Sequence, residues 1–119
     1  MKARVLMGII IRITMKKTFS DRVIEAALSV PAGRVTTYGD IARACGGGGQ
    51  AARSITGILG RAYKKGQTGI PFHRIVYSDG RVWKSKDYDK ARAKLYKTEG
   101  IIINEKGYID NFLSKRWEF

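Results

Sequence analysis

Residues 38–61 read YGDIARACGGGGQAARSITGILGR, with two amphipathic segments separated by four glycines. A short helix is predicted over Tyr38–Ala44, because a polar start is followed by apolar residues at helical spacing. The glycine run 46–49 breaks this helix, and a second helix is predicted from Gln50 to about Arg61. Two short helices joined by a tight glycine turn are typical of a helix-turn-helix.

Both helices of this stretch are amphipathic. Thr37 is a candidate cap for the first helix, on which Ile41 and Ala44 are expected to face inward. The apolar face of the second helix consists of Ala51, Ile55, Ile58 and Leu59. Arg53 and Arg61 lie on the same helix, so its solvent side is expected to be cationic.

A further helix is predicted on the N-terminal side, where Thr18 and Asp21 form a capping box and the Pro31-Ala32-Gly33 segment ends the helix. Residues 1–14 are interpreted as an N-terminal extension, either disordered or an artefact of an upstream start site, with an added β-strand as the competing interpretation. The functional domain is then residues 15–119.

On the C-terminal side, residues 75–77 and 81–83 flank Ser-Asp-Gly and predict a β-hairpin. A basic helix is predicted over residues 87–99, with Ala91, Leu95 and Tyr88 facing inward. The fold class is therefore mostly α with a small β-hairpin, a winged helix-turn-helix-like DNA-binding domain.

The charge of the chain points to an anionic partner. There are 23 Lys and Arg against 10 Asp and Glu, a formal net charge of +13, and each basic side chain brought to a phosphate releases condensed counterions. The alternative is a basic surface kept for solubility, but a few net charges already suffice for that.

Several classes of site are excluded or disfavoured. One cysteine, Cys45, and one histidine, His73, cannot form an internal disulfide or a Cys/His zinc site, and no cofactor motif is present. The apolar run 5–11 is too short to span a bilayer. These features favour a cytoplasmic protein with no membrane partner.

Four segments resemble one known family. Residues 30–42 resemble the start of the DNA-binding domain of O6-alkylguanine-DNA alkyltransferases, and residues 50–54 resemble its recognition helix. Residues 70–76, IPFHRIV, match its active-site motif Pro-Cys-His-Arg-Val except that Phe72 stands at the cysteine position. Residues 98–100 resemble the stretch that carries a buried glutamate. The order and approximate spacing of the four segments also match.

The missing cysteine identifies the subfamily that the chain resembles. Transferases move the alkyl group onto a thiolate, and a phenyl ring cannot accept it. The resemblance is therefore to the alkyltransferase-like proteins, which more often carry tryptophan there. It implies that the chain is not an enzyme, even where a family name reads methylated-DNA–cysteine methyltransferase.

The resemblance also implies DNA-binding residues. Arg53 matches the arginine finger that enters from the minor groove and replaces the extruded base, with a surface arginine as the alternative. Tyr38 matches the tyrosine that presses on the phosphate 3′ of the target nucleotide. Thr37, Gln50 and Ser54 are expected to contact DNA beside them.

A lesion pocket is implied by the same comparison. Phe72 is expected to line it, since an aromatic wall suits an alkylated O6, with a core phenylalanine as the alternative. His73 and Glu99 are expected to form a hydrogen-bonded scaffold, braced by Arg74. Trp83 is expected to contact the damaged strand or the alkyl group, with core packing as an equal alternative.

The resulting hypothesis is a damage sensor that binds duplex DNA containing alkylated guanine and flips the base. Its expected partners are that DNA and nucleotide excision repair proteins, and it is expected to be a monomer, nucleoid-associated in a prokaryote. The alternatives are an alkyltransferase with an atypical nucleophile, for which only Cys45 is chemically adequate, and a helix-turn-helix transcription regulator.

Overall fold

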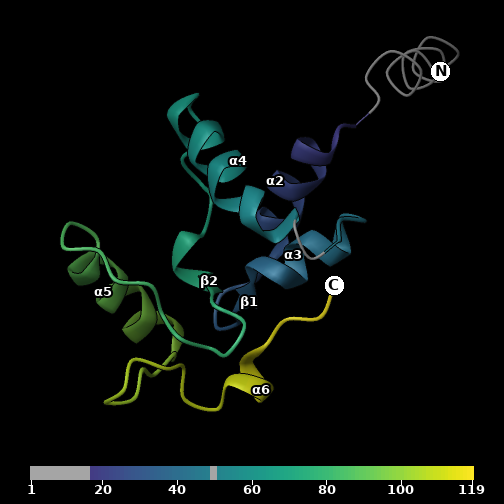
Figure 1. Ribbon diagram of the computed structural model, residues 1–119. Helices are drawn as coiled ribbons and strands as arrows, with labels where there is room; N and C mark the ends of the chain where they lie inside the picture. The colour runs from purple at the N-terminus through teal and green to yellow at the C-terminus, as the bar shows by residue number, and fades with distance from the viewer. Residues whose placement is uncertain (1–16, 49–50) are drawn as a thin grey trace, which may run out of the picture.

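The computed structural model describes residues 17–48 and 51–119, whose helices form two groups on either side of a short sheet (Figure 1). The first group comprises α2 (Phe19–Ser29), α3 (Tyr38–Ala44) and α4 (Ala52–Lys64), and the second comprises α5 (Asp89–Glu99) and α6 (Phe112–Lys115). The prediction of a mostly helical domain is confirmed. Among the described residues, no helix has the length and apolar character needed to cross a membrane. The predicted extension 1–14 lies outside the described residues.

Helix α2 begins with the predicted capping box. The Asp21 N–H donates to the Thr18 hydroxyl at 3.1 Å, and the Thr18 N–H donates to the Asp21 carboxylate at 3.0 Å. These two bonds satisfy N–H groups that a helix start leaves without partners. Val23 and Ala27, four residues apart, are fully buried and fix the face that α2 turns toward α3 and α4.

Helices α3 and α4, which form the predicted helix-turn-helix, pack on each other and on α2. Ile41 of α3 and Ile55, Ile58 and Leu59 of α4 lie in one buried cluster, as predicted. The inward residue beside Ile41 is Ala42, whereas Ala44 is exposed, so that part of the prediction was wrong. The helix has only two turns before Gly46 takes a positive φ of 84°, and Ala44 lies at its exposed end.

The sheet differs from the predicted hairpin. Strand β1 (Thr36–Thr37) pairs in parallel with β2 (Ile75–Val76), with Thr36 opposite Ile75. A tight turn does follow β2, since the Tyr77 N–H donates to the Arg81 carbonyl, but residue 81 forms its bridge with Tyr108 instead. The strand partner was wrong because both β1 residues are fully buried and take up the ladder positions beside β2.

Helix α5 packs through a different face from the predicted one. The predicted inward residues Ala91 and Leu95 are exposed, whereas Arg92 and Tyr96 are buried. Tyr96 belongs to a second core cluster with Val35, Val76, Val82, Ile101 and Ile109. Gly100 ends the helix with a φ of 73°, as its position predicted.

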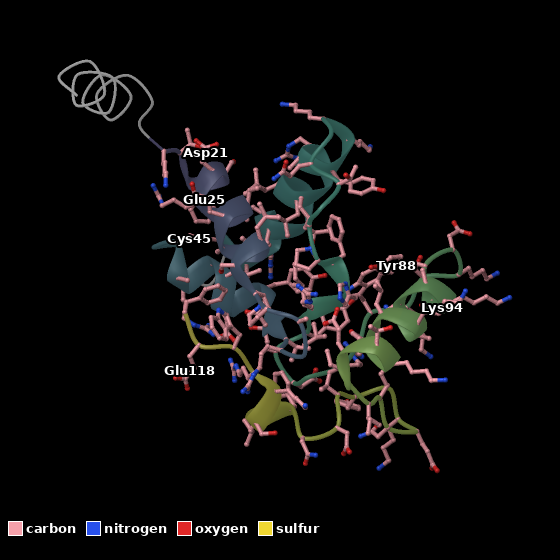
Figure 2. All side chains as sticks on the ribbon, turned by 180° about the vertical axis from the view of Figure 1, so that it is seen from behind. Asp21, Glu25, Cys45, Tyr88, Lys94 and Glu118 are labelled. Atoms are coloured by element: carbon pink, nitrogen blue, oxygen red, sulfur yellow. The ribbon has the colours of Figure 1, made fainter. Side chains whose placement is uncertain are left out.

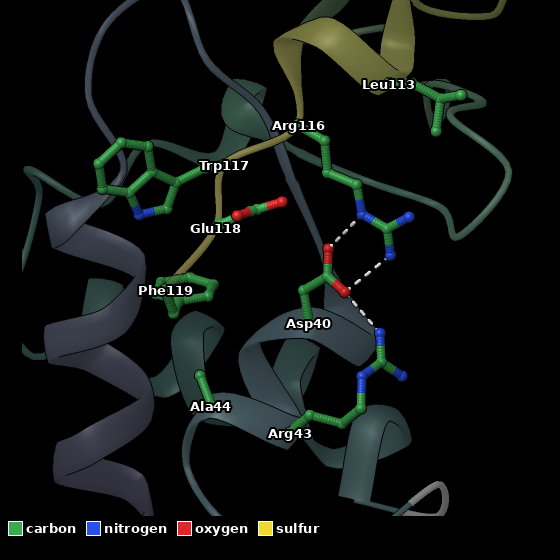
Figure 3. Close-up of a pocket in the computed structure, with 8 residues that line it drawn as sticks. All are labelled: Asp40, Arg43, Ala44, Leu113, Arg116, Trp117, Glu118 and Phe119. Carbon is green, nitrogen blue, oxygen red and sulfur yellow. Dashed lines mark hydrogen bonds and ion pairs between the residues drawn. The ribbon is translucent and has the colours of Figure 1, made fainter.

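The C-terminal tail returns to the helix-turn-helix. The Trp117 N–H donates to the Val35 carbonyl at 2.7 Å, next to β1. Figure 3 shows the Asp40 carboxylate of α3 between two guanidinium groups, and Arg116 donates to it through Nε at 2.7 Å and Nη2 at 2.8 Å. The tail, Asp40 and Arg43 line a hollow of about 620 Å³. Two parts of the chain remote in sequence are thereby joined.

Candidate nucleic-acid interface and base pocket

Glu99, at the end of α5, is the centre of a buried polar cluster. Its Oε2 lies 2.7 Å from His73 Nε2, and Arg74 donates to both carboxylate oxygens at 2.9 and 2.8 Å. The Gly33 N–H donates to Oε1 at 3.0 Å. His73 and Arg74 lie on the short helix η2 (Phe72–Arg74), so one carboxylate connects three separate segments.

The carboxylate of Glu99 is held in its ionised form. Burial raises its pKa, but the hydrogen bonds from Arg74, Gly33 and His73 outweigh burial and bring the pKa to about 2. An ionised carboxylate can only accept hydrogen bonds, so His73 Nε2 carries the proton in this contact. His73 is consequently a donor to Glu99 and is fixed in one orientation.

Two further contacts hold η2 in place. Arg74 Nη1 donates to the Val30 carbonyl at 2.9 Å, and the Tyr96 hydroxyl donates to the His73 carbonyl. Gly33 takes a φ of 86°, and a Cβ there would lie 3.3 Å from the Glu99 backbone oxygen. Glycine is therefore required for the loop to reach the carboxylate.

Phe72 begins η2 beside this cluster and is half-buried. Its ring lies 5.8 Å from that of Tyr63 on α4, at an interplanar angle of 72°. It also packs against the core of the first helix group. Phe72 thus lies between α4 and the polar cluster, with part of its surface open.

Trp83 packs between side chains of the segment that carries α5. Its ring is stacked on Tyr88 with centroids 5.4 Å apart and an interplanar angle of 3°, and the Arg92 guanidinium lies 5.0 Å from its centroid. Its indole N–H donates to the Ile75 carbonyl at 3.1 Å. The structure thus places Trp83 in a stack that fixes the segment between β2 and α5.

Tyr38 is the first residue of α3. Its ring centroid lies 6.1 Å from that of Tyr77, and burial together with Tyr77 raises the pKa of Tyr38 to about 12. The hydroxyl therefore stays protonated near neutral pH and is able to donate a hydrogen bond.

Of the other predicted DNA contacts, Arg53 and Ser54 are exposed in the first turn of α4, which contains no acidic residue. Arg53, Gly57, Arg61 and Lys64 recur at helical spacing on the exposed side, and the Arg61 guanidinium lies over Gly57. Gln50 lies outside the described residues.

The prediction for Thr37 needs correction. Its side chain is fully buried, and its hydroxyl accepts the Asp40 N–H at 3.0 Å as the cap of α3. No side-chain surface is left for a DNA contact. The capping role that the sequence also suggested is the one observed.

Cys45 is buried in the core of the first helix group. Burial raises the pKa of its thiol, which disfavours the nucleophilic thiolate. Cys45 and Tyr88 lie on opposite sides of the molecule in Figure 2. The cysteine is therefore remote from the segment that adjoins the predicted pocket.

Residues 18–101 match the family described as 6-O-methylguanine DNA methyltransferase, DNA binding domain. The chain belongs to this family. The match covers the helix-turn-helix, η2 and α5, and so contains the whole Glu99 cluster.

Two relatives in this family carry informative names. The chain is 35% identical over 103 residues to the DNA base-flipping protein of Escherichia coli, covering 86% of this chain and 76% of the relative. It is 35% identical over 68 residues to alkyltransferase-like protein 1 of Schizosaccharomyces pombe, covering 56% of this chain and 58% of the relative.

A solved structure in the family has the same fold. The crystal structure of S. pombe Atl1 in complex with damaged DNA containing O6-carboxymethylguanine matches with a TM-score of 0.67 and 26% identity. The match covers 85% of this chain and 95% of that one. The fold of this family member is thus one that has been crystallised on damaged DNA.

Sequence reasoning missed three residues that shape the candidate pocket of this family member. Tyr63 faces Phe72, while Tyr96 and Arg92 attach α5 to the His73 and Trp83 carbonyls. Arg92 and Tyr96 are four residues apart on one helix face, a spacing that was visible. The prediction placed Ala91 and Leu95 inward instead, because an arginine such as Arg92 is usually exposed.

Proposed function

We propose that this chain is a non-enzymatic sensor of O6-alkylguanine in duplex DNA, which extrudes the damaged base into a pocket walled by Phe72. The observation that carries the proposal is that Phe72 stands at the motif's cysteine position while the buried cluster of Glu99, His73 and Arg74 is intact. The relatives named for base flipping and the Atl1 complex with damaged DNA support it.

The pocket residues have the chemistry that an extruded base requires. Removing a base from the stack costs a few kcal/mol, and less for a mispaired, alkylated one. Aromatic contact with Phe72 offsets part of this cost, and the exposed ring of Tyr63 adds a second aromatic surface next to it. Trp83, which is stacked on Tyr88 in the segment that leads to α5, is proposed to contact the damaged strand.

The DNA-binding face is proposed to be the exposed side of α4 with the start of α3. Arg53 fills the gap that the base leaves, because its planar cation stacks on neighbouring bases. Tyr38 presses on the adjacent phosphate, and Ser54, with Gln50 as predicted from the sequence, contacts the backbone.

Alkyl transfer is not expected from these residues. The Phe72 ring has no lone pair to accept an alkyl group, and His73 is engaged with Glu99. Cys45 is buried, and its raised thiol pKa disfavours attack. The bound complex, acting as a monomer, is proposed to recruit nucleotide excision repair proteins in the cytoplasm, or at the nucleoid of a prokaryotic cell.

Binding and mass measurements together test this function. We expect about tenfold or greater preference for a duplex containing O6-methylguanine over the matched undamaged duplex, at several salt concentrations. The intact-protein mass should be unchanged after incubation with the methylated duplex. Equal affinity for both duplexes would favour a transcription regulator, and a methyl-sized mass gain would show a transferase.

A further inference from the structure

A basic hollow lies at the turn after β2, apart from Phe72 and the Glu99 cluster. It has a volume of about 530 Å³ and is lined mainly by Tyr77, Arg81, Trp83, Lys84, Lys106 and Tyr108. Residues from two segments meet here, because Arg81 bridges Tyr108 and the Val82 N–H donates to the Gly107 carbonyl at 2.9 Å. These backbone bonds give the hollow a fixed shape.

The lining of the basic hollow carries positive charge without compensation. Arg81, Lys84 and Lys106 contribute three cations, and no Asp or Glu is among its lining residues. None of the three forms an ion pair with another residue in the described part of the chain. The nearby Asp79 carboxylate accepts the Arg81 backbone N–H within the turn. Three unpaired cations around one concavity are suited to an anion.

Two of the three aromatic rings that line the basic hollow, Tyr77 and Trp83, already have stacking or cationic partners. The Arg81 guanidinium lies 4.8 Å from the Tyr77 ring centroid, and Trp83 is stacked on Tyr88 and contacted by Arg92. A nucleobase would have to displace these contacts in order to stack there. The cationic side chains are what the hollow presents, which favours phosphate over base.

The basic hollow adjoins the proposed DNA-binding face. Tyr77 lines it, and the Tyr77 ring lies 6.1 Å from that of Tyr38, the first residue of α3. Tyr38 is the residue proposed to press on the backbone phosphate beside the extruded nucleotide. A strand that contacts Tyr38 therefore reaches the hollow through the neighbouring tyrosine.

We propose that the basic hollow binds backbone phosphates of the lesion-carrying strand on one side of the extruded nucleotide. This inference rests on the proposed function, because it takes Tyr38 as a phosphate contact. It lengthens the footprint beyond the helix-turn-helix, and it contributes affinity equally to damaged and undamaged DNA, since phosphates carry no base identity.

The test compares two double variants with equal loss of charge. The hollow variant is Arg81→Gln with Lys106→Gln, and the control is Lys94→Gln with Lys97→Gln on the exposed side of α5. The Lys94 side chain extends away from the body of the molecule in Figure 2. Thermal unfolding of both variants checks that they fold as the wild type does. Affinity for an O6-methylguanine duplex is then measured over a range of KCl concentrations.

The hollow variant is expected to lower the slope of log K against log salt by about 1.8, or about 0.9 for each lost phosphate contact. The control should change it by less than half as much. Wild-type affinity should also fall when the duplex is shortened on one side of the lesion, whereas the hollow variant should be insensitive to that shortening.

Two results would overturn the proposal. One is a hollow variant whose salt-dependence slope and affinity equal those of the control, which would favour an acidic protein as the partner of the hollow. The other is equal sensitivity of the wild type to shortening on either side. The proposed function has a separate readout, the ratio of the affinities for damaged and undamaged DNA. A ratio of one in the wild type would contradict the proposed function. The hollow variant should leave this ratio unchanged.

Discussion

His73 Nε2 and Glu99 Oε2 lie 2.7 Å apart in a buried cluster that has no thiol in contact with it. The pair is nevertheless fully integrated, because the same carboxylate also accepts from Arg74 and from Gly33. The His73–Glu99 pair holds η2, which includes Phe72, against the end of α5. Stability and DNA binding should therefore respond differently to substitutions at these neighbouring positions.

Glu99→Gln should destabilise the fold by about 3 kcal/mol, because removing one partner leaves the buried Arg74 and His73 side chains without their anion. Urea unfolding measures this loss. Glu105→Gln, in an exposed turn, is the matched control and should change the free energy of unfolding by about 0.5 kcal/mol or less. Equal effects of the two would show that the cluster contributes no special stability.

Acid should remove the contribution of Glu99. The folded pKa of about 2 lies below the ordinary 4.5, so this stabilisation is complete above the unfolded pKa. It is lost as pH falls from about 4.5 to about 2, while the carboxylate becomes protonated in the unfolded chain first. Thermal unfolding midpoints between pH 6 and pH 2 should fall less steeply in Glu99→Gln than in the wild type. Parallel curves would contradict the assignment.

Phe72→Ala should weaken binding to an O6-methylguanine duplex by about tenfold, because the extruded base loses its aromatic wall. Binding to undamaged DNA should stay nearly unchanged. Fluorescence anisotropy with both duplexes measures the two effects. If both affinities fell by the same factor, Phe72 would be only a core residue.

Arg53→Ala should reduce affinity for the damaged duplex by more than one lost charge explains, since the vacated stack is left unfilled. We expect a loss of about tenfold or more, against a few-fold loss for Lys65→Ala just beyond α4. Arg53→Lys keeps the charge but lacks the planar head, and it should not restore binding. If Arg53→Lys bound with full affinity, Arg53 would act only through its charge, as a phosphate contact.

Asp40→Asn should loosen the C-terminal tail, because it weakens the two hydrogen bonds from Arg116. The expected loss of stability is about 1–2 kcal/mol, typical of hydrogen bonds to a charged group. Hydrogen exchange at the Trp117 N–H should accelerate more than exchange in α4. Asp110→Asn, an exposed position, should leave both rates unchanged.

The helix-turn-helix was predictable because its signals are local. The Thr37 cap of α3 and the apolar residues of α4 each act within a few residues of chain, as the Thr18–Asp21 capping box does for α2. The Glu99 cluster joins segments up to 66 residues apart, and only the family resemblance pointed to it.

What the sequence did not reveal depends on long-range pairing. A strand of two residues is too short to show an alternation of apolar and polar side chains. The pairing of Thr36 with Ile75 could therefore not be predicted from the sequence. Thr37 illustrates the same limit, because its burial depends on the whole fold, whereas the family resemblance implied a DNA contact. Ala91 and Leu95 of α5 were wrongly expected to be buried because the sequence does not show that the Arg92 guanidinium finds a buried partner in the Trp83 carbonyl.

The parallel pairing of Thr36–Thr37 with Ile75–Val76 holds two aromatic residues at a fixed separation. Tyr38 follows directly after one of these strands, and Phe72 lies three residues before the other, so the ladder sets the gap between them before any nucleotide arrives. Tyr38 and Phe72 are ordered when the chain folds, so the entropy cost of ordering them is not added to the cost of binding. The separation of Tyr38 and Phe72 is therefore a property of the folded chain itself.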